Sequence, residues 1–95
     1  MALDFATVPV TIGETSGTFT SNQDTTFSAF VQKADAAIKH LKLDAVGGAR
    51  PSDVVQVGVV GVSAHHTTVE FTVKAVYSGA SAFTGEIHVL VIAEF

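Results

Sequence analysis

The segment from Thr25 to Leu43 constrains the fold of this chain more than any other stretch. Its apolar residues recur at offsets of three and four, a spacing that places them on one face of an α-helix. They are Phe27, Phe30, Val31, Ala34, Ala37, Ile38 and Leu41. The charged residues fall mainly on the other faces, and Asp24 or Thr25 is a suitable N-cap. The pattern predicts one amphipathic helix over residues 25–43.

The rest of the sequence is typical of strands and turns. Four segments rich in β-branched residues are expected to form strands: residues 5–12, 53–63, 67–77 and 86–95. Residues 18–20 fit either a short strand or an extended connection. Pro9 has no amide hydrogen to donate, which favours an edge position or a bulge in the first strand. Residues 64–66 are expected to join two of the strands as a hairpin.

An amphipathic helix needs a surface on which to bury its apolar stripe, and here a sheet is the only candidate. We therefore expect an α+β fold of β-α-β-β-β order, with the helix packed on a curved, mainly antiparallel sheet of about four to five strands. A length of 95 residues predicts a single domain, residues 1–95.

Two of the expected strands are apolar on both faces. In the last strand Leu90 and Ile92 alternate with a second apolar set, and the strand over residues 53–63 has valines on both sides. One helix covers only one face, so the other face needs a barrel interior or a second subunit. The hydrophobic fraction of 47% also favours a subunit interface. The candidate self-association residues are Val55, Val57, Val59, Leu90 and Ile92.

Charge and composition exclude several classes of partner. The net charge is −4 and the five basic residues are scattered, which argues against nucleic-acid binding. Without cysteine, the chain has neither disulfides nor a thiolate metal site. There is no secretory signal pattern and no apolar run of the ~20 residues that a membrane span needs. We expect a soluble protein with no membrane partner, located in the cytoplasm, or in a virion if the gene is phage-encoded.

His65 and His66 are the most conspicuous polar pair. Adjacent strand residues point to opposite faces, so the two imidazoles can share a metal ion only if they lie in a turn. Candidates for a third ligand are Glu70, Glu86 and His88. A bare His-His pair is a weak zinc signal, and solvated histidines at a hairpin tip are the simpler interpretation. We predict no metal site and no cofactor.

Catalytic patterns are equally weak. Ser63 and His65 share a face, but the surrounding residues lack the second glycine and the following helix of a nucleophile elbow. No acidic partner for the histidine can be assigned. We therefore predict that the protein is not an enzyme. Tyr77 and Phe83 flank a loop of small residues over 78–82 and are candidates for the lip of a ligand pocket.

The expected order of elements is distantly similar to that of dodecins, which are small cage-forming flavin-binding proteins. The similarity rests on a helix ending in residues 36–42 and a later strand over residues 69–73, and it covers about half of the chain. The sequence departs from dodecins in having no tryptophan on which a flavin could stack, and in an additional C-terminal strand. The resemblance implies a homo-oligomer with a ligand site between subunits. Cystatin-like domains share the element order too, but residues 56–61 lack their Gln-x-Val-x-Gly signature.

Two functions follow from these patterns. The first is a non-enzymatic structural protein, a small homo-oligomerising subunit of a phage-like or cage-like particle. The alternative is an oligomeric small-ligand-binding protein, dodecin-like, whose inter-subunit site uses His65, His66, Tyr77 or Phe83. In both cases the expected partner is another copy of the chain.

Overall fold

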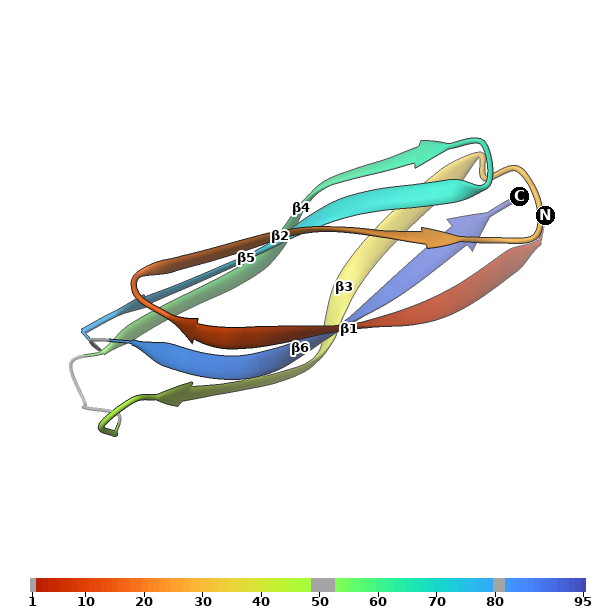
Figure 1. Cartoon of the computed structure of the whole chain (residues 1–95). Helices are drawn as coiled ribbons and strands as arrows, with labels where there is room; N and C mark the ends of the chain where they lie inside the picture. Colours follow the sequence, from red (N-terminus) through yellow and green to blue (C-terminus); the bar gives the residue numbers. More distant parts are fainter. Residues whose placement is uncertain (1, 49–52, 80–81) are drawn as a thin grey trace.

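A computed structural model describes residues 2–48, 53–79 and 82–95, which form six β-strands. They are β1 (Leu3–Thr15), β2 (Thr18–Thr26), β3 (Lys33–Ala45), β4 (Val54–His65), β5 (Thr68–Ser78) and β6 (Phe83–Glu94). All pairings are antiparallel and build two three-stranded sheets, with orders β1-β6-β3 and β2-β5-β4 (Figure 1). The described residues contain no helix that is long and apolar enough to cross a membrane.

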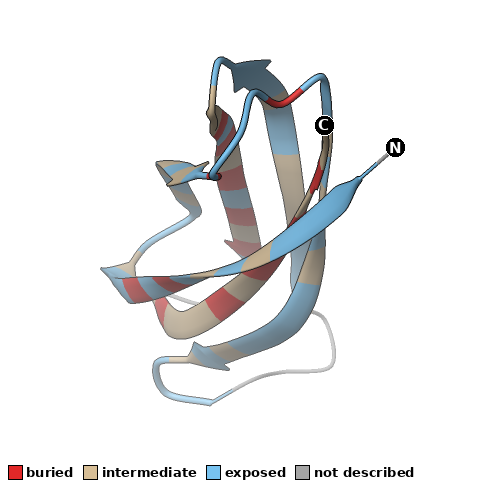
Figure 2. Ribbon diagram, turned by 90° about the vertical axis from the view of Figure 1, so that its right-hand side faces the viewer, coloured by how far each residue is buried: buried red, intermediate tan, exposed pale blue. Residues whose placement is uncertain are grey.

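The hydrophobic core lies between the two sheets, which pack as an elongated sandwich of 47 × 17 × 16 Å. The central strands β5 and β6 supply most of it, because every second side chain on each of them points inward. The buried residues of these strands are Val69, Phe71, Val73, Ala75, Tyr77, Phe83, Ile87, Val89, Val91 and Ala93. Figure 2 shows the resulting bands of buried and less buried residues along the strands. Burial of each large side chain stabilises the fold by about 1.5–3 kcal/mol.

The predicted helix and the α+β class are wrong, because the described chain is all-β. Residues 33–45 form β3, which pairs with β6. Ala34, Ala36 and Ile38 face the core, and the residues between them are exposed. An offset of four residues keeps two side chains on one face of a helix and also on one face of a strand, so Ala34 and Ile38 fit both periods. Pairing with β6 and burial against the other sheet override the helical preference of the alanines.

Two members of the predicted helical stripe, Phe27 and Val31, lie in the connection between the sheets. Their N–H groups donate hydrogen bonds to the carbonyl oxygens of Thr67 and His66, respectively, each over 2.8 Å. The ring of Phe27 also meets that of Phe95 edge-on, with 6.0 Å between centroids. Phe27 and Val31 are both buried, so this connection caps one end of the core.

Several predicted strands are confirmed, but the predicted number of sheets is wrong. The strands predicted over residues 5–12, 53–63, 67–77 and 86–95 correspond to β1, β4, β5 and β6, and a hairpin joins β4 to β5 as predicted. Pro9 lies in edge strand β1, as its missing amide hydrogen indicates. The single sheet of four to five strands is wrong. Residues 18–20 begin β2, and the expected N-caps Asp24 and Thr25 lie inside the same strand.

A bulge interrupts β4 near its end. The register with β5 shifts between Val60 and Ser63, and Gly61 has a φ of 65°, a left-handed conformation that glycine adopts without strain. The regular, bulge-free part of the strand is therefore Val54–Val60. We refer to this segment as the β4 edge, because β4 is an outer strand of the β2-β5-β4 sheet.

Candidate functional site

The outer face of the β1-β6-β3 sheet carries large apolar side chains. Leu3 and Phe5 are 53% and 57% exposed. Phe5 is paired with Ile92, and Thr7 with Leu90, so the two predicted self-association residues of β6 lie on the same face as Phe5. Sequence reasoning missed Leu3 and Phe5 as contact residues, although their i, i+2 spacing at the start of the first strand was a usable signal. This face is a candidate contact surface.

The β4 edge is a second apolar surface. Val54 and Val60 point away from the core and are 54% and 51% exposed, and Val55 is 43% exposed. Val57 and Val59 are partly buried and pack against the core. The five predicted self-association residues therefore divide between two places, with Leu90 and Ile92 on one sheet and the valines on the other.

The four predicted ligand-binding residues lie at the two ends of β5. His65 ends β4 and His66 begins the turn that leads into β5, with ring centroids 4.2 Å apart. Tyr77 lies near the other end of β5, about 30 Å away for a strand that rises about 3.3 Å per residue. Its ring stacks on that of Phe83 with 5.8 Å between centroids, and both are buried. The structure thus places these side chains in two separate locations, and the aromatic pair belongs to the core.

A cluster of partly exposed polar side chains lies beside the apolar residues on the outer face of the β1-β6-β3 sheet. His40 Nε2 and His88 Nε2 are each 3.7 Å from a carboxylate oxygen of Glu86, and the imidazole centroids are 4.9 Å apart. The sequence prediction placed His40 on a helix and therefore could not bring it to β6. In the part of the chain that the structure describes, no group of three or more histidine, aspartate or glutamate side chains is placed to hold a metal ion.

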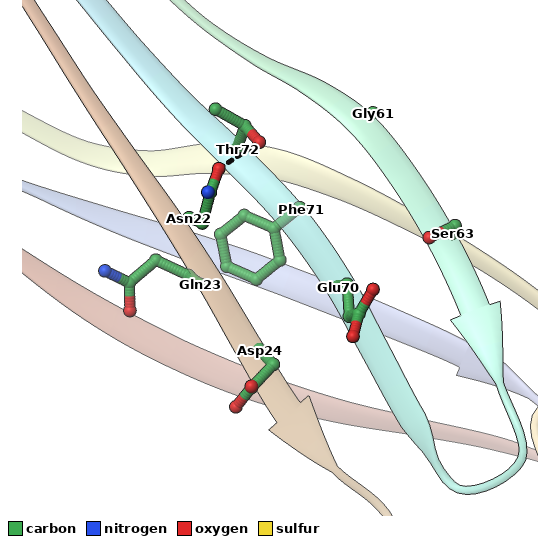
Figure 3. Close-up of a pocket in the computed structure, with 8 residues that line it drawn as sticks. All are labelled: Asn22, Gln23, Asp24, Gly61, Ser63, Glu70, Phe71 and Thr72. Carbon is green, nitrogen blue, oxygen red and sulfur yellow. Dashed lines mark hydrogen bonds between the residues drawn. The ribbon is translucent and has the colours of Figure 1, made fainter.

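A shallow polar depression of about 320 Å³ lies on the outer face of the β2-β5-β4 sheet (Figure 3). Thr72 Oγ1 donates a hydrogen bond to Asn22 Oδ1 across 2.8 Å, which ties β5 to β2. Asp24 lies directly opposite Glu70, and like charges in this position destabilise a strand pair. Ser63 faces Glu70 from the other side. The depression thus combines two carboxylates with neutral hydrogen-bonding groups.

The buried tyrosine has a polar partner. Tyr77 Oη donates a hydrogen bond to Asp53 Oδ2 over 3.1 Å. Removal from water, this hydrogen bond and the negative charge of Asp53 all raise the pKa of Tyr77 above its ordinary value of 10.0. The folded state therefore favours the neutral phenol, which packs against Phe83 at the end of the core.

The raised pKa of Tyr77 predicts a loss of stability in alkali. Below pH 10 the phenol is neutral in both states and its contribution to stability is complete. Above pH 10 the unfolded chain releases this proton first, so stability falls as the pH rises through the pKa of the folded state. The chain has one tyrosine and no tryptophan, so phenolate absorbance titrates this group directly. We expect a midpoint above 10 in the native protein and near 10 in denaturant, and equal midpoints would contradict the assignment.

Comparisons with models of protein families, with curated protein sequences and with solved structures found no match to this chain.

Proposed function

We propose that this chain is a non-enzymatic structural subunit that assembles with copies of itself. The observation that supports this function is apolar surface left over after the core is filled. Leu3, Phe5, Val54 and Val60 are each more than half exposed, although both central strands already bury a full set of inward side chains. Large apolar side chains that stay exposed beside a filled core are typical of protein contact sites.

The distribution of this surface also favours assembly. One apolar area lies on the outer face of β1 and β6, and the other lies along the β4 edge of the opposite sheet. A subunit with two separate contact surfaces can bind more than one copy, which is what a cage or a repeated array requires. Residues 54–64 of β4 carry no charged side chain, so charge repulsion between copies is small along this strand.

The ligand-binding alternative has less support. Its four candidate residues do not form one site within the chain, because His65 and His66 lie at one end of β5 and the rings of Tyr77 and Phe83 are buried at the other. The dodecin resemblance required a helix where the chain has β3. The structural role is therefore the better supported of the two functions.

The mass of the protein in solution tests this role. Size-exclusion chromatography with light scattering should give at least twice the chain mass of 9.8 kDa at high micromolar concentration, falling towards 9.8 kDa on dilution. The reason is that exposed apolar side chains are removed from water when copies associate. A mass of 9.8 kDa at every concentration would contradict the proposal.

A further inference from the structure

Three of the four edge strands carry features that hinder the addition of another strand. β1 contains Pro9, and its Asp4 carboxylate accepts a hydrogen bond from the N–H of Phe5 over 2.8 Å. In β3, the Asp35 carboxylate accepts one from the N–H of Ala36, also over 2.8 Å. Proline and charged side chains on an edge are known protections against edge-to-edge pairing. These two strands are poor templates for a partner strand.

Of the other two edge strands, β2 also hinders the addition of a strand, whereas β4 does not. β2 is short, mostly polar and carries Asp24. β4 has neither a charged residue nor a proline from Val54 to Ala64. Its only irregularity is the bulge at Gly61, beyond the β4 edge. An edge that is long, apolar and uncharged is a template for another strand, and the absence of charge means that two such edges do not repel each other.

The sequence of the β4 edge is self-complementary. Residues 54–60 read Val-Val-Gln-Val-Gly-Val-Val, which is the same in both directions except that Gln56 and Gly58 exchange places. Antiparallel pairing of two copies about Val57 places Gln56 of each copy opposite Gly58 of the other. It also places Val54 opposite Val60. The long side chain of Gln56 thus lies against Gly58, which has no side chain. Val54 and Val60, the two most exposed valines of the segment, contact each other.

The surface beside Gly58 has room for a side chain. A shallow groove of about 260 Å³ is lined by Gln56, Val57, Gly58, Val60, Lys74 and Val76. Apart from Gly58 itself and its two chain neighbours, no residue has an atom within 4 Å of the position that a Cβ of Gly58 would occupy. Gly58 is paired with Lys74 of β5, so a glutamine side chain over Gly58 also reaches the lysine. The ammonium group of Lys74 can donate a hydrogen bond to the amide oxygen.

From this register and groove, we propose that two copies of the chain pair antiparallel through their β4 edges, centred on Val57. The two β2-β5-β4 sheets then form one continuous six-stranded sheet with a two-fold axis. The interface is isologous and closes on itself, because each copy uses the same segment. This inference rests on the proposed self-association and names the contact that produces a dimer.

Disulfide trapping tests the register, because the natural chain contains no cysteine. Val54→Cys and Val60→Cys are purified separately, mixed and oxidised mildly. Opposed residues of antiparallel strands lie about 4.5–5.5 Å apart between Cα atoms, which suits a disulfide. The mixture should give a covalent dimer with one chain of each kind. Either variant alone should not, because its two cysteines would lie about 20 Å apart.

A matched control uses the other edge of the same sheet. Thr18→Cys and Asp24→Cys have the same spacing on exposed positions of β2, and their mixture should not form the covalent dimer.

A charge in the proposed interface should weaken the dimer. Val60→Lys places a charge opposite Val54 of the other copy without entering the core, and should raise the dimer dissociation constant by at least about tenfold. Circular dichroism checks that each variant keeps its fold.

The outcomes separate this inference from the proposed function. The mixed disulfide together with weaker association of Val60→Lys supports pairing through β4. An oligomeric mass without the mixed disulfide overturns the β4 contact and leaves self-association through another surface. A natural protein that stays at 9.8 kDa overturns both.

Discussion

Replacing Gly85 by alanine is expected to destabilise the protein by about 3 kcal/mol or more. Gly85 lies in β6 opposite Leu43 of β3. A Cβ at this position would collide with the backbone carbonyl oxygen of Lys42 and with the side chain of Leu43. The backbone of β3 cannot move aside without weakening its hydrogen bonds to β6. A domain of this size is stable by only about 5–14 kcal/mol, so the loss is large.

Urea denaturation of Gly85→Ala and of a matched variant, Gly13→Ala, measures this effect. Gly13 lies in β1 with no atom within 4 Å of its Cβ position, so alanine fits there. Alanine also restricts the unfolded chain, and we expect Gly13→Ala to change stability by less than about 1 kcal/mol. Equal denaturation midpoints for the two variants would show that β3 does not lie against Gly85.

The second large effect is expected for Phe71→Ala, with a loss of about 3–5 kcal/mol. Phe71 is 2% exposed on the inward face of β5, between the two sheets. Its removal takes apolar surface out of the core and leaves a cavity that the paired strands cannot close. Chemical denaturation monitored by circular dichroism gives the free energy of unfolding.

Phe30→Ala is the matched control, and it also separates the two folds. The helical pattern groups Phe30 with the buried stripe, whereas in the sandwich this side chain is 70% exposed. We therefore expect Phe30→Ala to cost less than about 1 kcal/mol. A loss similar to that of Phe71→Ala would contradict the sandwich and favour the helical packing.

Much of the β structure could be predicted from local pattern. Alternation identified β5, the β-branched runs identified β1, β4 and β6, and Pro9 indicated an edge. The segment around Ala34 and Ile38 was misassigned because an offset of four residues satisfies both helix and strand periods. Pairing with β6, which no local pattern encodes, decides between them.

Strand β2 of the second sheet could not be recognised from the sequence. β2 reads Thr-Phe-Thr-Ser-Asn-Gln-Asp-Thr-Thr, and Phe19 is its only apolar residue. Its inward positions include Ser21 and Gln23, so no apolar alternation marks it as a strand. β2 is a strand because it pairs with β5 along its whole length. Propensity is a weak guide where a polar strand is held by its neighbour.

The candidate site was predicted only in part for the same reason. Leu90 and Ile92 could be assigned to one face of a strand from the period of two, and they lie there. The residues beside them on that face, Phe5 and His40, come from strands whose partners the sequence does not reveal. Cross-strand neighbours depend on sheet order, which is set by the whole fold.

Amide hydrogen exchange along the β4 edge tests the central claim that a second copy covers surface left exposed by the single chain. Amide groups that point away from β5 should exchange fast in dilute protein and become protected as the concentration rises, because pairing supplies their hydrogen-bond partners. Protection over residues 54–60 that increases together with the mass of the particle is the predicted result. Exchange rates that do not depend on concentration, measured where the protein is oligomeric, would contradict it.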